Sequence, residues 1–244
     1  MIRIAAVGDV HFGDDSKGTL RPHLERLPDS ADVLILAGDL TRHGSADEAS
    51  VLADEIRDVA IPVVAVLGNH DYHCDEDKAI RDVMEAAGVT VLDGESTTMQ
   101  VNGTRLGVAG TKGFGGGFAG ACGSDFGEPE MKSFVRHTKS IAGRLFDLLE
   151  DLDADHRLVV LHYSPVEETL AGERLEIYPF LGSYLLAEAI DRAGADLVLH
   201  GHAHAGSEKG MTPGGIHVRN VAQPLIGRPY NVYCLGTGDL ACES

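Results

Sequence analysis

The sequence is poor in cysteine and has no long apolar run. None of its four cysteines belongs to a Cys-x-x-Cys pair, and their spacing matches no common zinc site or disulfide framework (Cys74, Cys122, Cys234 and Cys242). We therefore expect free thiols in a reducing compartment, the cytoplasm. No apolar run approaches the roughly 20 residues that a membrane helix needs. The N-terminal stretch MIRIAAVGDVHFGDD also lacks the pattern of a signal peptide, so we expect no membrane association.

Positive charge is scarce as well. The 20 lysines and arginines stand against 38 aspartates and glutamates and give a formal net charge of −18. A surface this acidic repels polyanions, which argues against binding of duplex DNA. A small anionic substrate stays compatible with this charge if local cations offset the field. Tryptophan is absent, whereas glycine is abundant with 30 residues, which favours tight turns and close approach of the backbone to a bound group.

Short apolar runs recur along the chain and alternate with helical patterns. Each run is closed by polar residues, glycine or a turn, as in the buried strands of an α/β sheet (residues 2–8, 32–38, 61–68, 105–110, 157–162 and 196–201). Helical spacing fills several of the intervals (46–58, 76–87, about 131–150 and about 183–193), and Ser45 is the predicted N-cap of the first helix. The alternation predicts an α/β fold in a single domain that spans residues 1–244.

Two hairpins and one long loop complete the predicted fold. Asn102-Gly103 lies between two strand-like stretches and is typical of a type I′ turn, and residues 207–211 face residues 216–221. The sheet should therefore be mixed. The glycine-rich stretch at about 111–130 contains Gly-x-Gly-x-x-Gly by letter count, but without the strand–turn–helix context of a dinucleotide site. We interpret it as a mobile loop, either a lid over a site or a surface loop without a role.

Metal-binding side chains close five of the predicted strands. These strands continue into Gly8-Asp9-Val10-His11, Gly38-Asp39, Gly68-Asn69-His70-Asp71, His162 and Gly201-His202-Ala203-His204. Ligands of open α/β sheets bind beyond the carboxyl ends of the strands, so these side chains can converge on one edge. Carboxylate, amide and imidazole donors without thiolate suit manganese, iron, zinc, cobalt or nickel better than magnesium or calcium.

Each of these residues has an ordinary explanation when it is taken alone. A single aspartate after a strand is usually a turn former or a helix N-cap. A single histidine is more often hydrogen-bonded in the core or at the surface than bound to a metal. Five strand ends that all supply metal-type side chains are hard to obtain from turn chemistry, so we favour a metal site.

Taken together, the five blocks resemble the signature of the calcineurin-like metallophosphoesterases, and they span residues 9–204 in the family's order. The resemblance implies a four-layer α/β/β/α sandwich, in which two mixed β-sheets are flanked by helices, with two divalent transition metal ions at one edge. Manganese or iron is favoured. The implied ligands form two sets that share one bridging carboxylate: Asp9, His11 and His204 for one ion, Asn69, His162 and His202 for the other, and Asp39 for both.

The implied activity is hydrolysis of a phosphomonoester or phosphodiester of a small molecule, such as a nucleotide, by a metal-bridging hydroxide. His70 is then the catalytic residue that faces the leaving group, where it stabilises the transition state or protonates the departing oxygen. Asp71 is expected to orient the His70 ring, to cap the helix that follows, or both. Three further residues lie where they could contact substrate or be ordinary surface residues: Arg42, His43 and Lys112.

Two alternatives stay open at this point. A nuclease for single-stranded nucleic acid can carry the same signature, but the acidic balance and the lack of an appended DNA-binding or coiled-coil segment weigh against it. A non-catalytic scaffold would lack some ligands or His70, and here all of them are present. His200 falls outside the implied ligand positions, and we expect it to be buried in its strand or to support a ligand.

Overall fold

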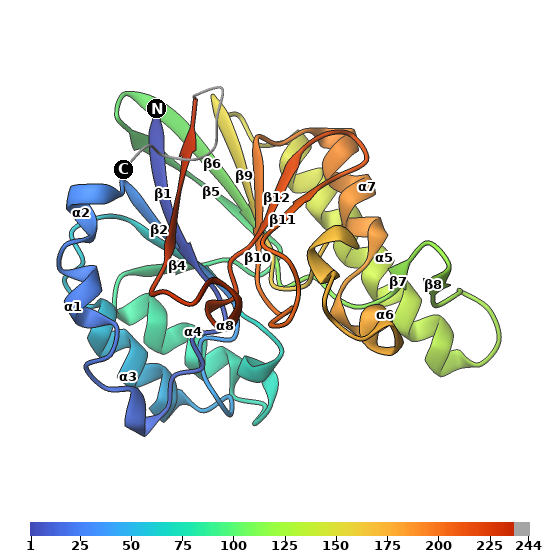
Figure 1. Ribbon diagram of the computed structural model, residues 1–244, viewed down its shortest axis with the longest axis horizontal. Helices are drawn as coiled ribbons and strands as arrows, with labels where there is room; N and C mark the ends of the chain where they lie inside the picture. Colours follow the sequence, from blue (N-terminus) through green and yellow to red (C-terminus); the bar gives the residue numbers. More distant parts are fainter. Residues whose placement is uncertain (237–244) are drawn as a thin grey trace.

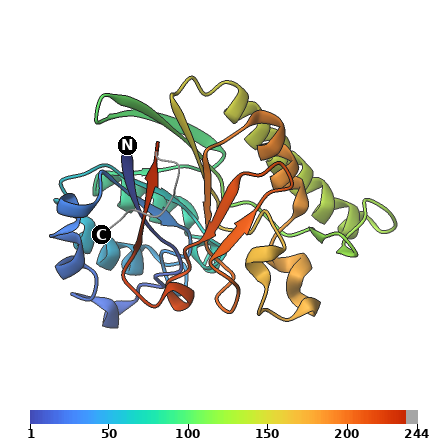
Figure 2. The same cartoon turned by 45° about the horizontal axis from the view of Figure 1, so that its top comes forward.

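The computed structural model describes residues 1–236, which form four layers (Figure 1). The first sheet has the strand order β13 (Asn231–Leu235), β1 (Ile2–Val7), β2 (Val33–Ala37), β3 (Val63–Val66) and β4 (Val89–Val91). The second has the order β11 (Lys209–Met211), β12 (His217–Asn220), β10 (Leu197–His200), β9 (His156–Val160), β6 (Thr104–Gly110) and β5 (Glu95–Val101). Both sheets are mixed, and Figure 2 shows them between two helical layers. The predicted α/β/β/α sandwich is confirmed.

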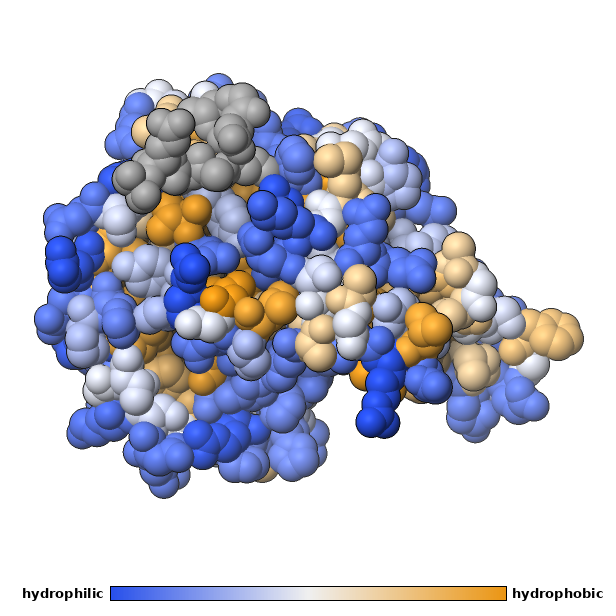
Figure 3. Space-filling model, viewed as in Figure 1, coloured by the Kyte–Doolittle hydropathy of each residue, from blue (hydrophilic) through white to orange (hydrophobic). Residues whose placement is uncertain are grey.

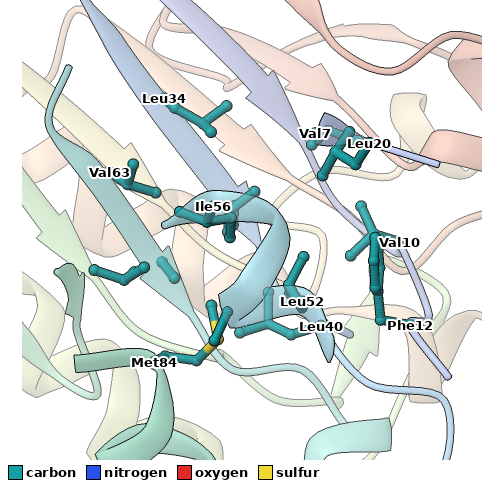
Figure 4. Close-up of a cluster of buried hydrophobic side chains, with 14 of the residues drawn as sticks. Val7, Val10, Phe12, Leu20, Leu34, Leu40, Leu52, Ile56, Val63 and Met84 are labelled. Atoms are coloured by element: carbon teal, nitrogen blue, oxygen red, sulfur yellow. The ribbon is translucent and has the colours of Figure 1, made fainter. Parts of the chain in front are cut away.

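Buried strands with two apolar faces hold these layers together. Successive side chains of a strand point to opposite faces. In β1, Ile2 and Ile4 therefore lie in the core between the sheets, whereas Ala5 and Val7 lie in the core under the helices. Figure 4 shows this helix-side core, where side chains of the first sheet meet those of the helices above it. Continuous apolar runs were therefore the correct signal for the strands of this fold.

Helices cover the outer face of each sheet. The first sheet packs under α1 (Arg21–Leu24), α2 (Leu27–Ser30), α3 (Ala46–Ile56) and α4 (Asp77–Ala86), and the second under α5 (Pro129–Glu150) and α7 (Tyr184–Ala193). The predicted N-cap is confirmed, because the Ser45 hydroxyl accepts a hydrogen bond from the Glu48 amide. The four predicted helices thus lie within two residues of their expected bounds at each end.

Both predicted hairpins are present. Val101 pairs with Thr104 across the first turn, and Asn102 and Gly103 both have positive φ angles (51° and 79°), as a type I′ turn requires. Strands β11 and β12 pair antiparallel as expected. The long glycine-rich stretch is more ordered than predicted, since it contains the strands β7 (Gly117–Phe118) and β8 (Ala121–Cys122).

Two aromatic contacts pack this stretch against the second half of the chain. The Phe118 ring is buried with Leu170, Tyr178 and Leu181, the last two from the short helix α6 (Tyr178–Leu181). The Phe114 ring lies 5.1 Å from that of Phe134. Figure 3 shows hydrophobic side chains gathered around this end of the molecule, where five large apolar residues are exposed: Phe126, Met131, Leu175, Ile177 and Phe180. Its role as a lid stays a prediction.

The cysteines correct one expectation. Cys74 and Cys122 carry free thiols, but the sulfur of Cys234 is disulfide-bonded, and Cys242 lies outside the described residues. Spacing along the chain cannot show which sulfurs the fold brings together, so four free thiols were the wrong prediction. Among residues 1–236, no helix is both long and apolar enough to cross a membrane.

Candidate metal centre

The seven implied ligands come together at the carboxyl ends of five strands. The strand ends of β1, β2, β3, β9 and β10 supply them, and β1 and β10 both run toward the short helix α8 (Gln223–Ile226) in Figure 1. Potential ligand atoms of Asp9, His11, Asp39 and His204 lie within 4.8 Å of one another, and so do those of Asp39, His162 and His202. Asn69 joins the second group, because its Oδ1 lies 2.9 Å from Nε2 of His162. Asp39 alone belongs to both groups.

The backbone is strained at four of these positions. Asp9, His11, Asp39 and His202 have positive φ angles of 56°, 43°, 50° and 71°, which residues other than glycine rarely adopt. Such conformations cost on the order of 1–3 kcal/mol each and persist only where the surrounding structure imposes them. Strain at four adjoining positions marks this strand edge as a functional site.

Glycines allow the backbone to pass close to the buried carboxylates. A Cβ atom on Gly68 would lie 2.1 Å from Oδ1 of Asp39, and one on Gly201 would lie 2.2 Å from Oδ2 of Asp9. At Gly38, where φ is +83°, a Cβ would lie 2.5 Å from Nδ1 of His162. All three distances are far below van der Waals contact, so these glycines are required for the ligands to converge.

We expect Gly68→Ala to weaken metal binding by about 10- to 100-fold, because the added methyl group must displace the Asp39 carboxylate. The measurement is metal content after dialysis against graded metal concentrations. Gly143→Ala is the matched control, since Gly143 lies inside α5 with open space around its Cβ position. That variant should keep full metal binding and gain about 0.5–1 kcal/mol in the free energy of unfolding. Equal metal affinity in both variants would contradict the role of Gly68.

A hydrogen bond fixes which ring nitrogen of His162 faces the site. Nδ1 of His162 lies 2.9 Å from the carbonyl oxygen of Ala37, so Nδ1 carries the hydrogen and donates it. Nε2 then faces two oxygen atoms, Oδ1 of Asn69 at 2.9 Å and Oδ1 of Asp39 at 3.2 Å. A lone pair between two oxygens is stable only with a positive charge between them. Burial lowers the pKa of His162, but the charge of Asp39 outweighs it and raises the pKa to about 9.

His202 presents its other nitrogen to the site. Nε2 of His202 donates to the carbonyl oxygen of Phe180 at 3.2 Å, which leaves Nδ1 as the basic nitrogen of the neutral ring. Burial keeps the ring neutral by lowering the pKa of His202 to about 3. The backbone of α6 therefore sets the tautomer of His202, a role usual for the outer hydrogen bond of a metal-binding histidine.

The remaining donors also fit a cation. Among residues 1–236, Nε2 of His11 is buried without a hydrogen-bond partner, 3.7 Å from Oδ2 of Asp39. A buried nitrogen of this kind is costly unless something binds it. Nε2 of His204 lies 2.8 Å from Oδ1 of Asp9. Burial raises the pKa of Asp39, yet the facing His162 charge and hydrogen bond hold it well below its usual range. Ionised carboxylates and free imidazole nitrogens are what divalent transition metals bind.

Asp71 does not orient the His70 ring, which corrects the sequence prediction. The buried Asp71 carboxylate accepts hydrogen bonds from the amides of Leu40, Thr41 and Gly68 and from the Thr41 hydroxyl, at 2.6 to 3.1 Å. It does not cap α4 either, whose N-cap is Glu76. Asp71 instead ties the loop after β2 to the loop after β3. The sequence pattern could not show that Asp71 bonds to these loops instead of to His70.

We expect Asp71→Asn to lower the free energy of unfolding by about 1–3 kcal/mol. All four groups around the carboxylate are donors, so an asparagine NH₂ group would face another donor and leave it unpaired. Chemical denaturation followed by circular dichroism measures the change. The exposed Asp93 offers a control, because Asp93→Asn should shift the midpoint by far less. Equal midpoints for the two variants would show that Asp71 does not hold the loops.

His70 lies at the open side of the cluster. Its Nδ1 donates to the carbonyl oxygen of Arg42 at 2.8 Å, and its Nε2 lies 4.0 Å from Oδ2 of Asp39. The ring packs edge-on against that of His11, with centroids 4.5 Å apart. The side chain is 44% exposed, so Nε2 is the part of the ring that a substrate can reach. The Arg42 carbonyl, which sequence reasoning missed, orients this ring.

The three predicted substrate contacts have different surroundings. Arg42 pairs with Asp15 at 2.8 Å and lines a cavity beside Asp9 and His11. Nζ of Lys112 lies 4.2 Å from the centroid of the Tyr72 ring, and burial lowers the pKa of Lys112. His43 is bound to Glu48 in the first turn of α3 through its ring and its amide. Arg42 and Lys112 thus lie near the cluster, whereas His43 is held at the start of α3 by Glu48.

His200 is buried and fully hydrogen-bonded inside the protein. Its Nδ1 donates to the carbonyl oxygen of Gly201 at 2.7 Å, and its Nε2 accepts from the Thr169 hydroxyl at 2.8 Å. Burial lowers its pKa to about 4. Asn220 supports the same loop through the carbonyl oxygen of Ala203. His200 is therefore buried at the end of its strand, as expected, and supports the loop that carries His202 and His204. No sequence pattern pointed to Thr169 or Asn220.

Comparisons with known proteins agree with this arrangement. A family model described as calcineurin-like phosphoesterase matches residues 2–206. A probable cyclic nucleotide phosphodiesterase from Fibrobacter succinogenes is 32% identical over 80 residues, which are 29% of this chain and 31% of that relative. The chain thus matches less than a third of that relative's length.

Two solved structures share the fold. Phosphopantetheinyl hydrolase from Mycobacterium tuberculosis has a TM-score of 0.71 at 17% identity, with 98% of each chain covered. A 5′-nucleotidase described as putative, from Staphylococcus aureus, has a TM-score of 0.55 at 18% identity, covering 90% of this chain and 48% of that one. At these identities the likeness shows a common architecture and no more.

Proposed function

Because the chain belongs to the calcineurin-like phosphoesterase family, we propose that it hydrolyses a phosphodiester of a small molecule, such as a nucleotide, with two divalent metal ions. The observation that carries the proposal is the pair of ligand groups that share Asp39, with His70 beside them. One group alone would be an ordinary metal site. Two groups that share a carboxylate, next to an accessible imidazole, form a site for phosphoryl chemistry.

The donors divide into two sets. Asp9, His11 and His204 would hold one ion, Asn69, His162 and His202 would hold the other, and Asp39 would contact both. Nitrogen and oxygen donors without sulfur favour manganese, iron, zinc, cobalt or nickel. When bound, two such ions supply charge neutralisation for the phosphoryl oxygens and acidify a bound water molecule.

His70 is the proposed proton donor. Hydrolysis adds water across a P–O bond, so the departing oxygen needs a proton. The hydrogen bond from Nδ1 to the Arg42 carbonyl holds the ring so that Nε2 faces the open side of the cluster. A protonated Nε2 there gives its proton to the leaving oxygen as the P–O bond breaks. The same nitrogen is then left to take up a proton from solvent.

The scarcity of free positive charge around the site favours a diester over a monoester. A phosphodiester carries one negative charge, whereas a phosphomonoester carries nearly two at neutral pH. Arg42 is already neutralised by Asp15. Lys112 lies against the Tyr72 and Phe114 rings, and burial lowers its pKa. With little free positive charge beyond the metals, the singly charged diester fits better.

Two chromogenic substrates test the proposal. The protein is treated with EDTA, dialysed, restored with Mn²⁺, and assayed on bis-p-nitrophenyl phosphate and on p-nitrophenyl phosphate. We expect turnover only after metal is restored, with the diester preferred in kcat/KM. The absence of metal-dependent turnover on both esters and on a nucleotide panel would overturn the proposed activity. A preference for the monoester would overturn the diester assignment alone.

A further inference from the structure

A cavity of about 430 Å³ opens beside the metal centre, and the proposed mechanism does not use it. Asp9 and His11 form one end, and the opposite wall comes from α8 and the segment after it, through Gln223, Pro224 and Pro229. This wall lies beyond residue 206, where the match to the family model ends. One wall of the cavity is therefore built by a part of the chain that the family model does not match.

The cavity has the size and position of a pocket for one ester group. Pockets for small molecules usually have volumes of roughly 300–1,000 Å³. Two of its residues are implied metal ligands, so a phosphoryl group on the metals would lie at its inner end. A substituent of that phosphoryl group can extend from there toward α8. The cavity is thus connected to the reacting centre instead of being a separate surface hollow.

The walls are mixed in polarity. Phe12, Leu20 and the two prolines supply apolar surface, and the first two are almost completely buried. Ser16, Thr19 and Gln223 supply polar groups. The Gln223 side chain is half-buried, and within the described part of the chain its side-chain amide makes no hydrogen bond. A half-buried amide group without a protein partner can bind a ligand whose polar edge both donates and accepts hydrogen bonds.

The walls beyond the metal ligands contain a single charged side chain, and it is already paired. Arg42 is the one positive side chain among the lining residues, and the exposed carboxylate of Asp15 binds it at 2.8 Å. A second phosphate would find no free cation there, and an acyl chain would leave the polar groups of the wall unpaired. An uncharged group with apolar surface and a hydrogen-bonding edge needs no cation and can pair with the polar groups of the wall.

We infer that this cavity binds an uncharged, nucleoside-sized ester group of the substrate, with Gln223 bound to its polar edge. The inference rests on the proposed function, because it places that group on the phosphodiester that the metal centre would cleave. A nucleoside and an amide-containing chain share this chemistry. The experiment therefore uses probes that vary only this ester group.

Three p-nitrophenyl diesters that share one leaving group test the inference in the Mn²⁺-loaded protein. They carry a methyl group, 5′-thymidine, or choline as the second ester group. We expect kcat/KM for the thymidine ester to exceed that of the methyl ester by about 10- to 100-fold, with the cationic choline ester close to the methyl ester. Equal values for methyl and thymidine esters, or a preference for choline, would overturn the inference.

Two tryptophan variants separate the cavity from the metal centre. Thr19 is exposed at the cavity wall, so Thr19→Trp should fill the cavity and reduce the ratio of thymidine-ester to methyl-ester kcat/KM to near one. Ala119→Trp is the matched control, since Ala119 is exposed at the wall of a different cavity of about 440 Å³. It should keep the wild-type preference. Equal losses on both esters in Thr19→Trp would count against the cavity as the binding site.

A binding measurement covers the case in which no ester is hydrolysed. Thymidine alone has no phosphate, so saturation-transfer NMR on the metal-free protein reports the cavity without the catalytic centre. We expect a thymidine signal in the wild type and in Ala119→Trp, and its loss in Thr19→Trp and Gln223→Leu. No signal in the wild type would overturn the inference, whereas a normal signal without turnover would overturn only the proposed activity. Competition by pantetheine for the thymidine signal would identify an amide chain as an alternative source of the same chemistry.

Discussion

Replacement of Asp39 by asparagine should lower turnover by about 10³- to 10⁴-fold, because several kcal/mol of charge stabilisation depend on both metals. Asp39 is the residue that both ligand groups share, and its carboxylate faces His11, His162 and the His70 amide. A neutral amide can replace only part of this role. Metal analysis by mass spectrometry should show fewer than two ions per chain, and bis-p-nitrophenyl phosphate should report the loss of activity.

Asp58→Asn is the matched control for this substitution. Asp58 also has a positive φ angle (71°, compared with 50° at Asp39), but it is exposed and lies at a different surface hollow, beside Arg57 and Val59. The same chemical change in the same backbone conformation should leave metal content and turnover unchanged. An Asp39→Asn protein that keeps two ions and wild-type activity would show that Asp39 does not bridge the two groups.

The second large effect should come from His70. Replacement by alanine is expected to lower kcat by about 10²- to 10⁴-fold, the usual contribution of a general acid. Metal content should stay at the wild-type level, because His70 lies outside both ligand groups and its Nδ1 is bound to the Arg42 carbonyl. The loss should shrink for a diester with a better leaving group, such as a dinitrophenyl ester, since that oxygen needs no proton.

His73→Ala serves as the control for His70→Ala. His73 is exposed and caps the C-terminal end of the 3₁₀ helix His70–Tyr72, where its amide donates to the His70 carbonyl. Its substitution removes an imidazole at nearly the same place without touching the cluster. If His70→Ala loses its metals, then His70 is a ligand or holds one, and its assignment as proton donor is wrong.

Much of the fold followed from local patterns. The six apolar runs became strands because buried strands of this sandwich face a core on both sides, and a continuous apolar run is the direct record of that burial. Strands β4 and β13 were missed for different reasons. β4 has only three residues and an exposed Thr90 at its centre, and β13 begins with half-buried residues. Neither has a pattern that stands out from its surroundings.

The site was predictable as far as residue type and strand position define it. Polar residues after strands must lie at the same edge when those strands are parallel, so the seven proposed ligands could be foreseen as a group. Hydrogen-bond partners could not. Asp71 is adjacent to His70 in sequence but bonds to Leu40 and Thr41, and the Phe180 carbonyl reaches His202 from a segment with no motif. Such contacts depend on loop geometry that one sequence does not encode in its periodicity.

The pairing of β1 with β13 has a consequence for how the protein is made. Ile2 pairs with Leu235 and Ala6 with Asn231, so β1 pairs with a strand that is synthesised more than 220 residues later. The loop that carries Asp9 is also fastened late, because the Gly8 amide bonds to the Val221 carbonyl and the Gly8 carbonyl to the Gln223 amide. On the ribosome, the first sheet and the candidate metal centre therefore stay incomplete until residues 221–235 emerge. Pairings this far apart in sequence form late, and until then the strand edge that carries Asp9 is left unfinished.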